Sequence, residues 1–253
     1  PPYRKRGSKR GCRDSGRPNK TPYKRSWGPY STANGAEGPK TGSAPDPAVY
    51  EAFLDACRPV EGAALDWLKG KVPDMTDALV EVLRLRFCGR EYLDAVDGLK
   101  TRFGDAALLA AGLLKRSKTD RLVPSFWHYY AKRAGFLVIP YLLNGRPVYL
   151  KARPPTSKDK AEHLGLVRFL NTATAVPCLY NADALTAQPV PDKVFVCEGE
   201  SDTWTALAAG AVAVGSPGAR QFKPAWVEGF RAFAGADGKS RVYLVLDADA
   251  AGT

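Results

Sequence analysis

The feature that most constrains the fold is an alternation of apolar runs and helical segments near the end of the chain. The continuous apolar runs "KVFVC", "AVAVG" and "RVYLVL" are separated by "SDTWTALAAG" and "KPAWVEGFRAFAG", which have helical spacing. Strands that are apolar throughout and alternate with helices are typical of a parallel sheet covered on both faces. The sequence therefore predicts an α/β fold, with a βαβαβ unit over residues 191–253.

Acidic residues follow the first and the third of these predicted strands. Glu198 ends the first strand and Asp202 comes four residues later, while Asp247 and Asp249 end the third strand. The carboxyl ends of parallel strands meet at one edge of a sheet, where ligands bind. Carboxylates that converge repel one another, and Mg²⁺, which prefers oxygen ligands, removes that repulsion. We therefore predict a Mg²⁺ site, with Mn²⁺ as an alternative, in which these four carboxylates are the ligands and which suits phosphoryl chemistry.

Two glycines accompany the acidic residues. Gly199 would let the backbone approach a ligand closely, and Gly252 would let the chain turn after the second acidic pair. Each acidic motif alone is also typical of a solvated loop after a strand. The combination of both motifs at one predicted sheet edge favours the metal site.

The first segment of the chain has the composition of a disordered basic arm. Residues 1–45 contain 11 of the 37 Lys and Arg residues but 2 of the 26 Asp and Glu residues, so they carry +9 of the net charge of +11. Pro, Gly and Ser are frequent there and aliphatic residues are scarce, so the arm cannot bury enough apolar surface to become ordered. Its aromatic residues favour contact with nucleic acid over a solubilising linker. These are Tyr3, Tyr23, Trp27 and Tyr30.

Two further regions lie between the arm and the parallel sheet. Residues 46–120 have apolar residues at helical spacing, which predicts a helical N-terminal part. Residues 121–190 contain more β-type runs, and Asn144-Gly145 between two such runs is a strong signal for a hairpin. The segment "VRFLN" is a further short strand. We therefore expect a small mixed α/β subdomain before the parallel sheet.

The cysteines and the hydropathy restrict the class of protein. The five cysteines are scattered without ligand spacing, so we expect neither a zinc site nor a disulfide framework, but reduced thiols. No apolar stretch approaches the roughly 18 residues of a membrane-spanning helix. The basic N-terminus lacks the apolar core of a signal peptide. These features predict a cytoplasmic protein with no membrane partner.

The acidic motifs resemble those of a known domain. The segments "VFVCEGESDTWTAL" and "VYLVLDADAAGT" are similar to the two signature motifs of the Toprim domain. Bacterial-type (DnaG-like) primases share that domain with type IA and type II topoisomerases and with some nucleases and recombination proteins. In this resemblance Glu198 is the invariant acid, Asp202 is the acid that primases carry, and Asp247 and Asp249 form the Asp-x-Asp pair. The resemblance implies that Glu198, Asp247 and Asp249 are catalytic.

The preceding residues are similar to a primase catalytic core. Over roughly residues 120–253, five features occur in the order that primases show. They are an apolar strand containing Pro140, a Gly-Arg hairpin at Gly145-Arg146, a second arginine, the motif "RFLN" and the pair "LY". Cationic side chains ahead of a metal site can hold phosphates, although each alone could also be a solvated strand face. The predicted nucleotide- or template-binding residues are Arg146, Lys151, Arg153, Arg168 and Asn171.

The resemblance implies a specific activity. It is the Mg²⁺-dependent synthesis of short RNA primers on single-stranded DNA from ribonucleoside triphosphates for DNA replication, by a nucleotidyltransferase of the DNA-directed RNA polymerase type. A replicative helicase, fused or separate, is the implied protein partner. The spacings are more similar to phage or plasmid primases, so we expect the chain in a bacterial cell or a phage-infected host.

Two features of the family are missing from the sequence. These residues show no N-terminal zinc-binding module, which is either cut off, lost or replaced by the basic arm, and the chain stops before the further acidic pair that primases carry. We therefore expect a truncated core with an incomplete Toprim sheet. Two alternatives stay open at this point. One is a Toprim nuclease or topoisomerase-type DNA-processing protein, and the other is a non-catalytic nucleic-acid-binding adaptor.

Overall fold

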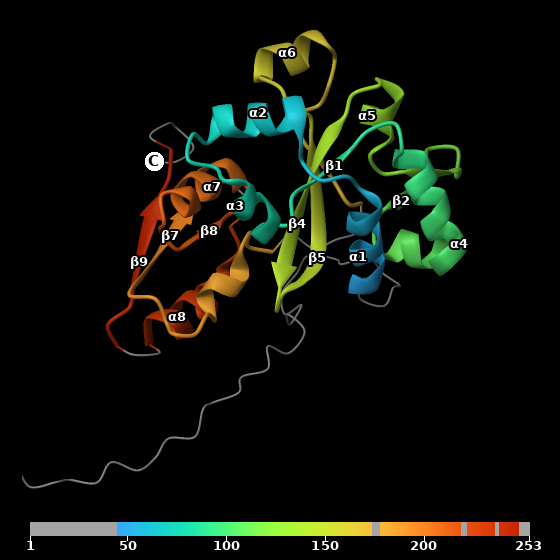
Figure 1. The fold of residues 1–253 in the computed structure, drawn as a ribbon. Coiled ribbons are helices and arrows are strands. Elements are labelled where there is room, and N and C mark those ends of the chain that lie inside the picture. Colours follow the sequence, from blue (N-terminus) through green and yellow to red (C-terminus); the bar gives the residue numbers. More distant parts are fainter. Residues whose placement is uncertain (1–44, 174–177, 219–221, 236–237, 248–253) are drawn as a thin grey trace, which may run out of the picture. The chain divides into compact units, whose positions relative to one another are not determined.

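The computed structural model describes residues 45–173, 178–218, 222–235 and 238–247. Apart from Pro45, the predicted basic arm lies outside the described residues, and so do Asp249 and Gly252. The described residues combine helices with three sheets, one of which is parallel (Figure 1), which confirms the predicted α/β class.

The region up to residue 131 contains helices and three short strands. The helices are α1 (Pro47–Ala56), α2 (Gly62–Lys71), α3 (Asp77–Val82), α4 (Tyr92–Ala110) and α5 (Trp127–Ala131), and the strands are β1 (Arg86–Cys88), β2 (Leu114–Arg116) and β3 (Leu122–Pro124). Asp46 caps α1 by accepting a hydrogen bond from the amide of Ala48 at 2.9 Å, and Pro47 occupies the first helical position. Strands β1 and β2 were not expected in the helical N-terminal part, because runs of three residues are too short to show a period.

A long antiparallel hairpin forms the centre of the largest sheet. Strands β4 (Phe136–Leu143) and β5 (Arg146–Arg153) pair with each other, and Asn144 and Gly145 between them have φ values of 53° and 73°. Positive φ at both turn residues matches the right-handed twist of the strands, so the predicted Asn-Gly hairpin is confirmed. The Asp183 carboxylate accepts hydrogen bonds from both turn amides, at 2.6 and 2.7 Å.

The hairpin is flanked on both edges and buried on both faces. The sheet has the order β1-β4-β5-β6, where β6 is Leu170–Asn171, and α6 (Lys158–His163) lies between β5 and β6 in the chain. Because side chains alternate along a strand, Leu150 and Ala152 of β5 face the core that contains α1 and α4. Tyr149 belongs to the core on the opposite face, together with residues of α2, α3 and α7 (Glu200–Ala208).

The last part of the chain forms the predicted parallel sheet. After the short 3₁₀ turn η1 (Ala182–Leu185), the elements are β7 (Lys193–Cys197), α7, β8 (Ala213–Gly215), η3 (Pro224–Trp226), α8 (Val227–Gly235) and β9 (Arg241–Val245). Strand β7 lies between β8 and β9 and is parallel to both, which confirms the βαβαβ order. Its core residues Val194 and Val196 pack with Phe230 and Phe233 of α8.

Strand β9 departs from the expectation that both faces of this sheet are covered. Within the described residues it is an edge strand, and the side chains of Tyr243, Leu244 and Val245 are exposed. The side chains of β7, by contrast, are largely buried. The apolar sequence of β9 thus predicted a strand correctly but not its exposure, because burial depends on the elements that pack against it.

A buried aromatic cluster joins the central hairpin to helix α7. The rings of Tyr149 and Tyr180 meet the ring of Tyr141 edge-on, with centroids 4.9 and 5.1 Å apart. The indole nitrogen of Trp204 in α7 donates a hydrogen bond to the hydroxyl of Tyr180 at 2.8 Å. These contacts hold α7 against the hairpin face that carries Tyr149.

In the described residues, no helix is both long enough and apolar enough to cross a membrane.

A candidate active site at the start of helix α7

The parallel register brings the acidic residues of β7 and β9 together. Cys197 pairs with Val245, so Glu198 and Asp247 follow neighbouring strands at the same edge. The amide of Asp247 donates a hydrogen bond to the Glu198 carboxylate at 3.2 Å. Partial burial, followed by the charges of Asp247 and Glu198, raises the pKa of the Asp202 carboxyl in the first turn of α7. Three of the four predicted ligands therefore lie at one sheet edge, and Asp249 lies outside the described residues.

The chemistry of this acidic edge fits a hard divalent cation. Its groups are carboxylate oxygens, and the raised pKa of Asp202 reflects partial burial and the negative charges of Asp247 and Glu198. Among the residues that the structure describes, no three acidic, histidine or cysteine side chains lie close enough together to hold a metal ion. Carboxylate oxygens are the donor type that Mg²⁺ prefers, and the Mg²⁺ site stays a prediction.

Gly215, which was not among the predicted residues, has the closest packing of the glycines at this edge. Gly199 is extended, with φ −156°, and an added Cβ would lie 3.7 Å from the Asp202 carboxylate, an ordinary contact. At Gly215, in contrast, a Cβ would lie 2.5 Å from the Thr203 hydroxyl oxygen and 3.1 Å from the carbonyl oxygen of Gly199. The absence of a side chain at Gly215 therefore allows the end of β8 to pack closely against Gly199 and Thr203.

A basic pocket lies around Arg153 at the end of β5. Arg153 is buried, and its guanidinium lies between the rings of Trp67 and Phe169, 4.6 and 5.0 Å from their centroids. Burial, followed by the charge of Arg168, lowers the pKa of Arg153 to about 10. The Nε of Arg153 is buried and has no hydrogen-bond partner among the described residues. A buried cation in this state favours an anionic ligand.

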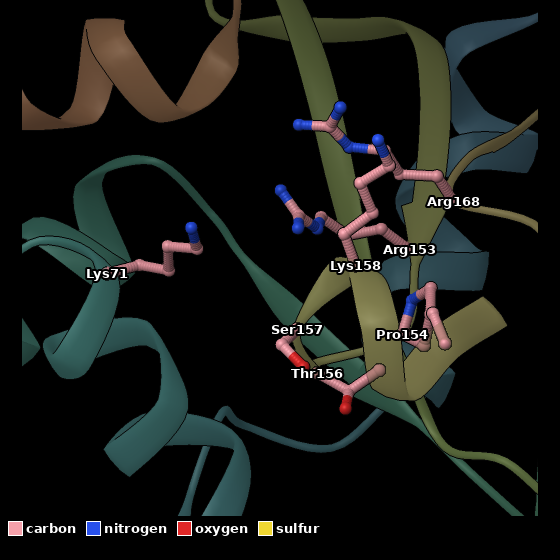
Figure 2. Close-up of a pocket in the computed structure, with 8 residues that line it drawn as sticks. Lys71, Arg153, Pro154, Thr156, Ser157, Lys158 and Arg168 are labelled. Carbon is pink, nitrogen blue, oxygen red and sulfur yellow. The ribbon is translucent and has the colours of Figure 1, made fainter. Parts of the chain in front are cut away.

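The pocket has about 330 Å³ of space, including the solvent at its mouth. Figure 2 shows Lys71 of α2 on one side and Arg153, Lys158 and Arg168 on the other. Its lining residues are Lys71, Arg153, Pro154, Thr156, Ser157, Lys158, Ala161 and Arg168. In the described part of the chain, the four cations form no ion pair with a carboxylate. Four unneutralised cations beside two hydroxyl groups suit a phosphate-bearing ligand.

The predicted phosphate-binding residues are only partly brought together. Arg153 and Arg168 share the pocket, and Asn171 is exposed on β6 beside Lys151 in register. Arg146 is at the opposite end of β5, about 23 Å along the strand from Arg153. The pKa of Glu51 in α1 is lowered first by its hydrogen bond to Arg84, and the charge of Arg146 makes a smaller contribution.

Lys151 differs from the prediction in another way. Its side chain is buried, and its ammonium group lies 2.5 Å from the Glu200 carboxylate and donates to the Pro217 carbonyl at 2.8 Å. In this structure the ammonium group is therefore committed to interior acceptors. The prediction that it contacts a nucleotide or template does not agree with this placement, because a period of two places Lys151 on a strand face but does not show what packs there.

Sequence reasoning missed Lys71 and Lys158 as pocket residues. Lys71 lies one helical turn after Trp67 in α2, so the sequence does place a cation on the helix face that carries the ring stacked on Arg153. No local signal, however, indicates that α2 packs beside β5. Lys158 follows the α6 N-cap Ser157, and its position depends on the loop after β5.

The acidic edge and the basic pocket meet at the first turn of α7. The Nη1 of Arg153 donates a hydrogen bond to the hydroxyl oxygen of Ser201 at 3.3 Å. Ser201 directly precedes Asp202 in the chain. The first turn of α7 therefore connects the cations of the pocket with the carboxylates of the acidic edge.

Comparisons with known proteins give similarity in structure alone. No protein-family model and no curated protein sequence matches the chain. The RNA polymerase domain of Mycobacterium tuberculosis primase DnaG superposes with a TM-score of 0.59 at 18% identity, covering 81% of this chain and 67% of that one. A DnaG primase catalytic domain bound to ssDNA gives 0.54 at 18% identity, covering 82% and 64%.

A third similar structure contains the zinc-binding and RNA polymerase domains of Aquifex aeolicus primase. It gives a TM-score of 0.57 at 14% identity and covers 81% of this chain and 48% of that one. The chain thus spans between about half and two thirds of the length of these structures. At such low identities the similarity shows the fold, and the chain has a DnaG-like primase catalytic fold.

Proposed function

We propose that this chain carries the catalytic core of a DNA primase. The activity is the synthesis of short RNA primers on single-stranded DNA from ribonucleoside triphosphates, for DNA replication. The observation that carries the proposal is the meeting of the acidic edge with the basic pocket at the first turn of α7, within a DnaG-like fold. The parallel sheet is, in this proposal, a Toprim domain, because its acids follow β7 and β9 as the Toprim motifs require.

The residues divide the chemistry between them. Mg²⁺ or Mn²⁺ held by Glu198, Asp202, Asp247 and Asp249 would supply activation of a 3′-hydroxyl and neutralise charge on the reacting phosphate. Arg153 and Arg168, with Lys71 and Lys158, bind phosphates of the nucleotide or the template. Catalysis of phosphoryl transfer is mostly positioning and electrostatics, so cations and carboxylates held by the fold near the first turn of α7 suit it.

The partners follow from the same proposal. One of the similar structures is a DnaG catalytic domain bound to ssDNA, which supports single-stranded DNA as the template here. The basic arm, with its interleaved aromatic residues, would add sequence-independent contacts to that strand. We also propose a replicative helicase, fused or separate, as a partner, and a primase of the phage or plasmid type.

A primer-synthesis assay tests the proposed activity. The full chain is incubated with single-stranded DNA, labelled ribonucleotides and Mg²⁺, and the expected result is short RNA that disappears in EDTA. The double variant Asp247→Asn/Asp249→Asn should lose at least about 100-fold in rate, because it removes two ligand charges. Asp97→Asn, an exposed carboxylate on α4, is the matched control and should keep full activity. Nicking of DNA without nucleotides would instead indicate a Toprim nuclease.

A binding assay tests the basic pocket separately from catalysis. Inorganic tripolyphosphate and a short single-stranded oligonucleotide serve as probes, titrated by calorimetry. Lys71→Ala and Lys158→Ala should each weaken the preferred probe about three- to tenfold, because each removes one phosphate contact. Lys69→Ala is the control on the same helix, since the Lys69 ammonium is paired with Asp77 at 2.9 Å. Equal effects of all three substitutions would show that the pocket acts only through its net charge.

A further inference from the structure

A buried ion pair connects the central hairpin to the first turn of α7. The side chains of Lys151 in β5 and Glu200 in α7 are each 6% exposed, and their charged atoms lie 2.5 Å apart. The hydroxyl of Tyr141 in β4 donates a hydrogen bond to the same carboxylate oxygen of Glu200. The Lys151 ammonium also donates to the carbonyl of Pro217, which follows β8. The pair thus holds together the hairpin, α7 and the segment after β8.

Stability alone does not account for such a pair. Two charges lose their hydration when they are buried, and apolar residues of similar volume often stabilise a fold as well or better. Breaking one partner, by contrast, leaves an unpaired charge in the interior. A buried pair whose hydrogen bonds are all made fixes the relative position of the two segments that carry it, because the ammonium group finds its acceptors and the carboxylate its donors in only one arrangement.

The position that this pair defines is next to the acidic edge. Glu200 lies between Glu198 and Asp202 in the chain, and Asp247 donates its amide to Glu198. The neighbouring Ser201 accepts a hydrogen bond at 3.3 Å from Arg153, two residues along β5 from Lys151. Two cations on one face of β5 therefore anchor the same helical turn.

We propose that Glu200 is a positioning residue, which Lys151 and Tyr141 hold so that Glu198 and Asp202 stay directed toward Asp247. This inference rests on the proposed function, in which those carboxylates hold a divalent cation. The competing assignment is that Glu200 is itself a ligand of that cation. The geometry favours positioning, because one oxygen of Glu200 already accepts from both Lys151 and Tyr141.

Removing the lysine charge separates the two assignments by the sign of its effect. Mn²⁺ is titrated into the full chain and into Lys151→Met, and binding is followed by electron paramagnetic resonance. A positioning role predicts about tenfold weaker Mn²⁺ binding, as is usual when a residue that orients a ligand is lost. Tighter binding would show that Lys151 competes with the metal for Glu200, and unchanged binding would show that the pair is only structural. Either of those results overturns the proposal.

Further variants guard against a folding defect. The double variant Lys151→Met/Glu200→Gln removes both charges and keeps an oxygen that accepts from Tyr141, so Mn²⁺ binding should return to within about threefold of wild type. A ligand role for Glu200 predicts the opposite, a further loss. Tyr141→Phe keeps the ring, removes one hydrogen bond and should weaken binding about threefold.

Arg84→Met is the matched control, because it breaks the partly buried pair with Glu51 in another part of the fold. It should lower thermal stability and leave Mn²⁺ binding unchanged. The failure of this inference can be told apart from the failure of the proposed function. If the wild-type chain binds no Mn²⁺, both fall, whereas wild-type binding that Lys151→Met does not alter removes the positioning role alone.

Discussion

Replacing Gly215 by alanine should destabilise the chain and disturb the acidic edge at the same time. The new Cβ would lie 2.5 Å from the Thr203 hydroxyl oxygen, 3.1 Å from the Gly199 carbonyl oxygen and 3.3 Å from the Tyr180 Cβ. Gly215 cannot withdraw, because its amide and carbonyl are both hydrogen-bonded to Tyr180, at 3.0 and 2.8 Å. Thr203 is fully buried and β-branched, so its side chain has few alternative rotamers.

The size of the effect follows from these contacts. Overpacking of this kind typically costs about 1–3 kcal/mol. The hydrogen bond that Thr203 donates to the Gly199 carbonyl at 2.8 Å would also be strained or lost, which adds roughly 0.5–1.5 kcal/mol. We therefore expect Gly215→Ala to lower the free energy of unfolding by about 2–4 kcal/mol.

Urea unfolding followed by circular dichroism measures this change. Gly98→Ala is the control, because Gly98 lies within α4 and an added Cβ meets nothing within 4 Å, so it should stabilise by up to about 1 kcal/mol. In the double variant Gly215→Ala/Thr203→Ala the closest contact is gone. Its loss of unfolding free energy should be at least about 1 kcal/mol smaller than the sum of the losses of the two single variants. A loss below about 0.5 kcal/mol for Gly215→Ala, or strict additivity, would refute the reasoning.

Two other substitutions test the acidic edge and the hairpin turn. Asp202→Asn should raise the melting temperature in EDTA by about 2 °C, because partial burial and, after it, the charges of Asp247 and Glu198 disfavour the charged carboxylate of Asp202. Since the folded-state pKa of Asp202 is raised, its negative charge opposes folding above that pKa. The gain in melting temperature should therefore shrink as the pH falls through the pKa. A gain in melting temperature that is constant with pH would contradict this cause. Asp183→Ala removes the acceptor of both turn amides, at 2.6 and 2.7 Å, and should lower the free energy of unfolding in urea by about 1–3 kcal/mol. Asp192→Ala replaces an exposed residue and is the control, which should lower it by less than about 0.5 kcal/mol.

The elements that the sequence predicted correctly are those with a local physical signature. The Asn144-Gly145 turn needs positive φ at both positions, and few residue pairs other than Asn-Gly tolerate this. The apolar runs separated by helices predicted β7, β8 and β9 in parallel order. The meeting of Glu198 with Asp247 followed from topology, since neighbouring parallel strands end at the same edge.

The short strands and the exposure of β9 could not be predicted in the same way. A three-residue strand such as β1 shows no period, and its pairing partner β4 is about fifty residues away in the chain. The exposed side chains of Tyr243 and Leu244 have the same apolar composition as buried ones. Burial is a property of the neighbours that a strand finds in space, and one segment of sequence does not contain them.

The sequence by itself determined which residues share a face of β5. Alternation places Lys151 and Arg153 together, opposite Leu150 and Ala152. Only the tertiary structure decided their roles, because α7 packs over that face and brings Glu200 to Lys151, while α2 brings Trp67 and Lys71 to Arg153. One lysine thereby becomes a buried anchor and the neighbouring arginine becomes part of a pocket. The two differ because long-range packing sets the solvent exposure and the charge partners of a side chain, and a strand period carries no information about either.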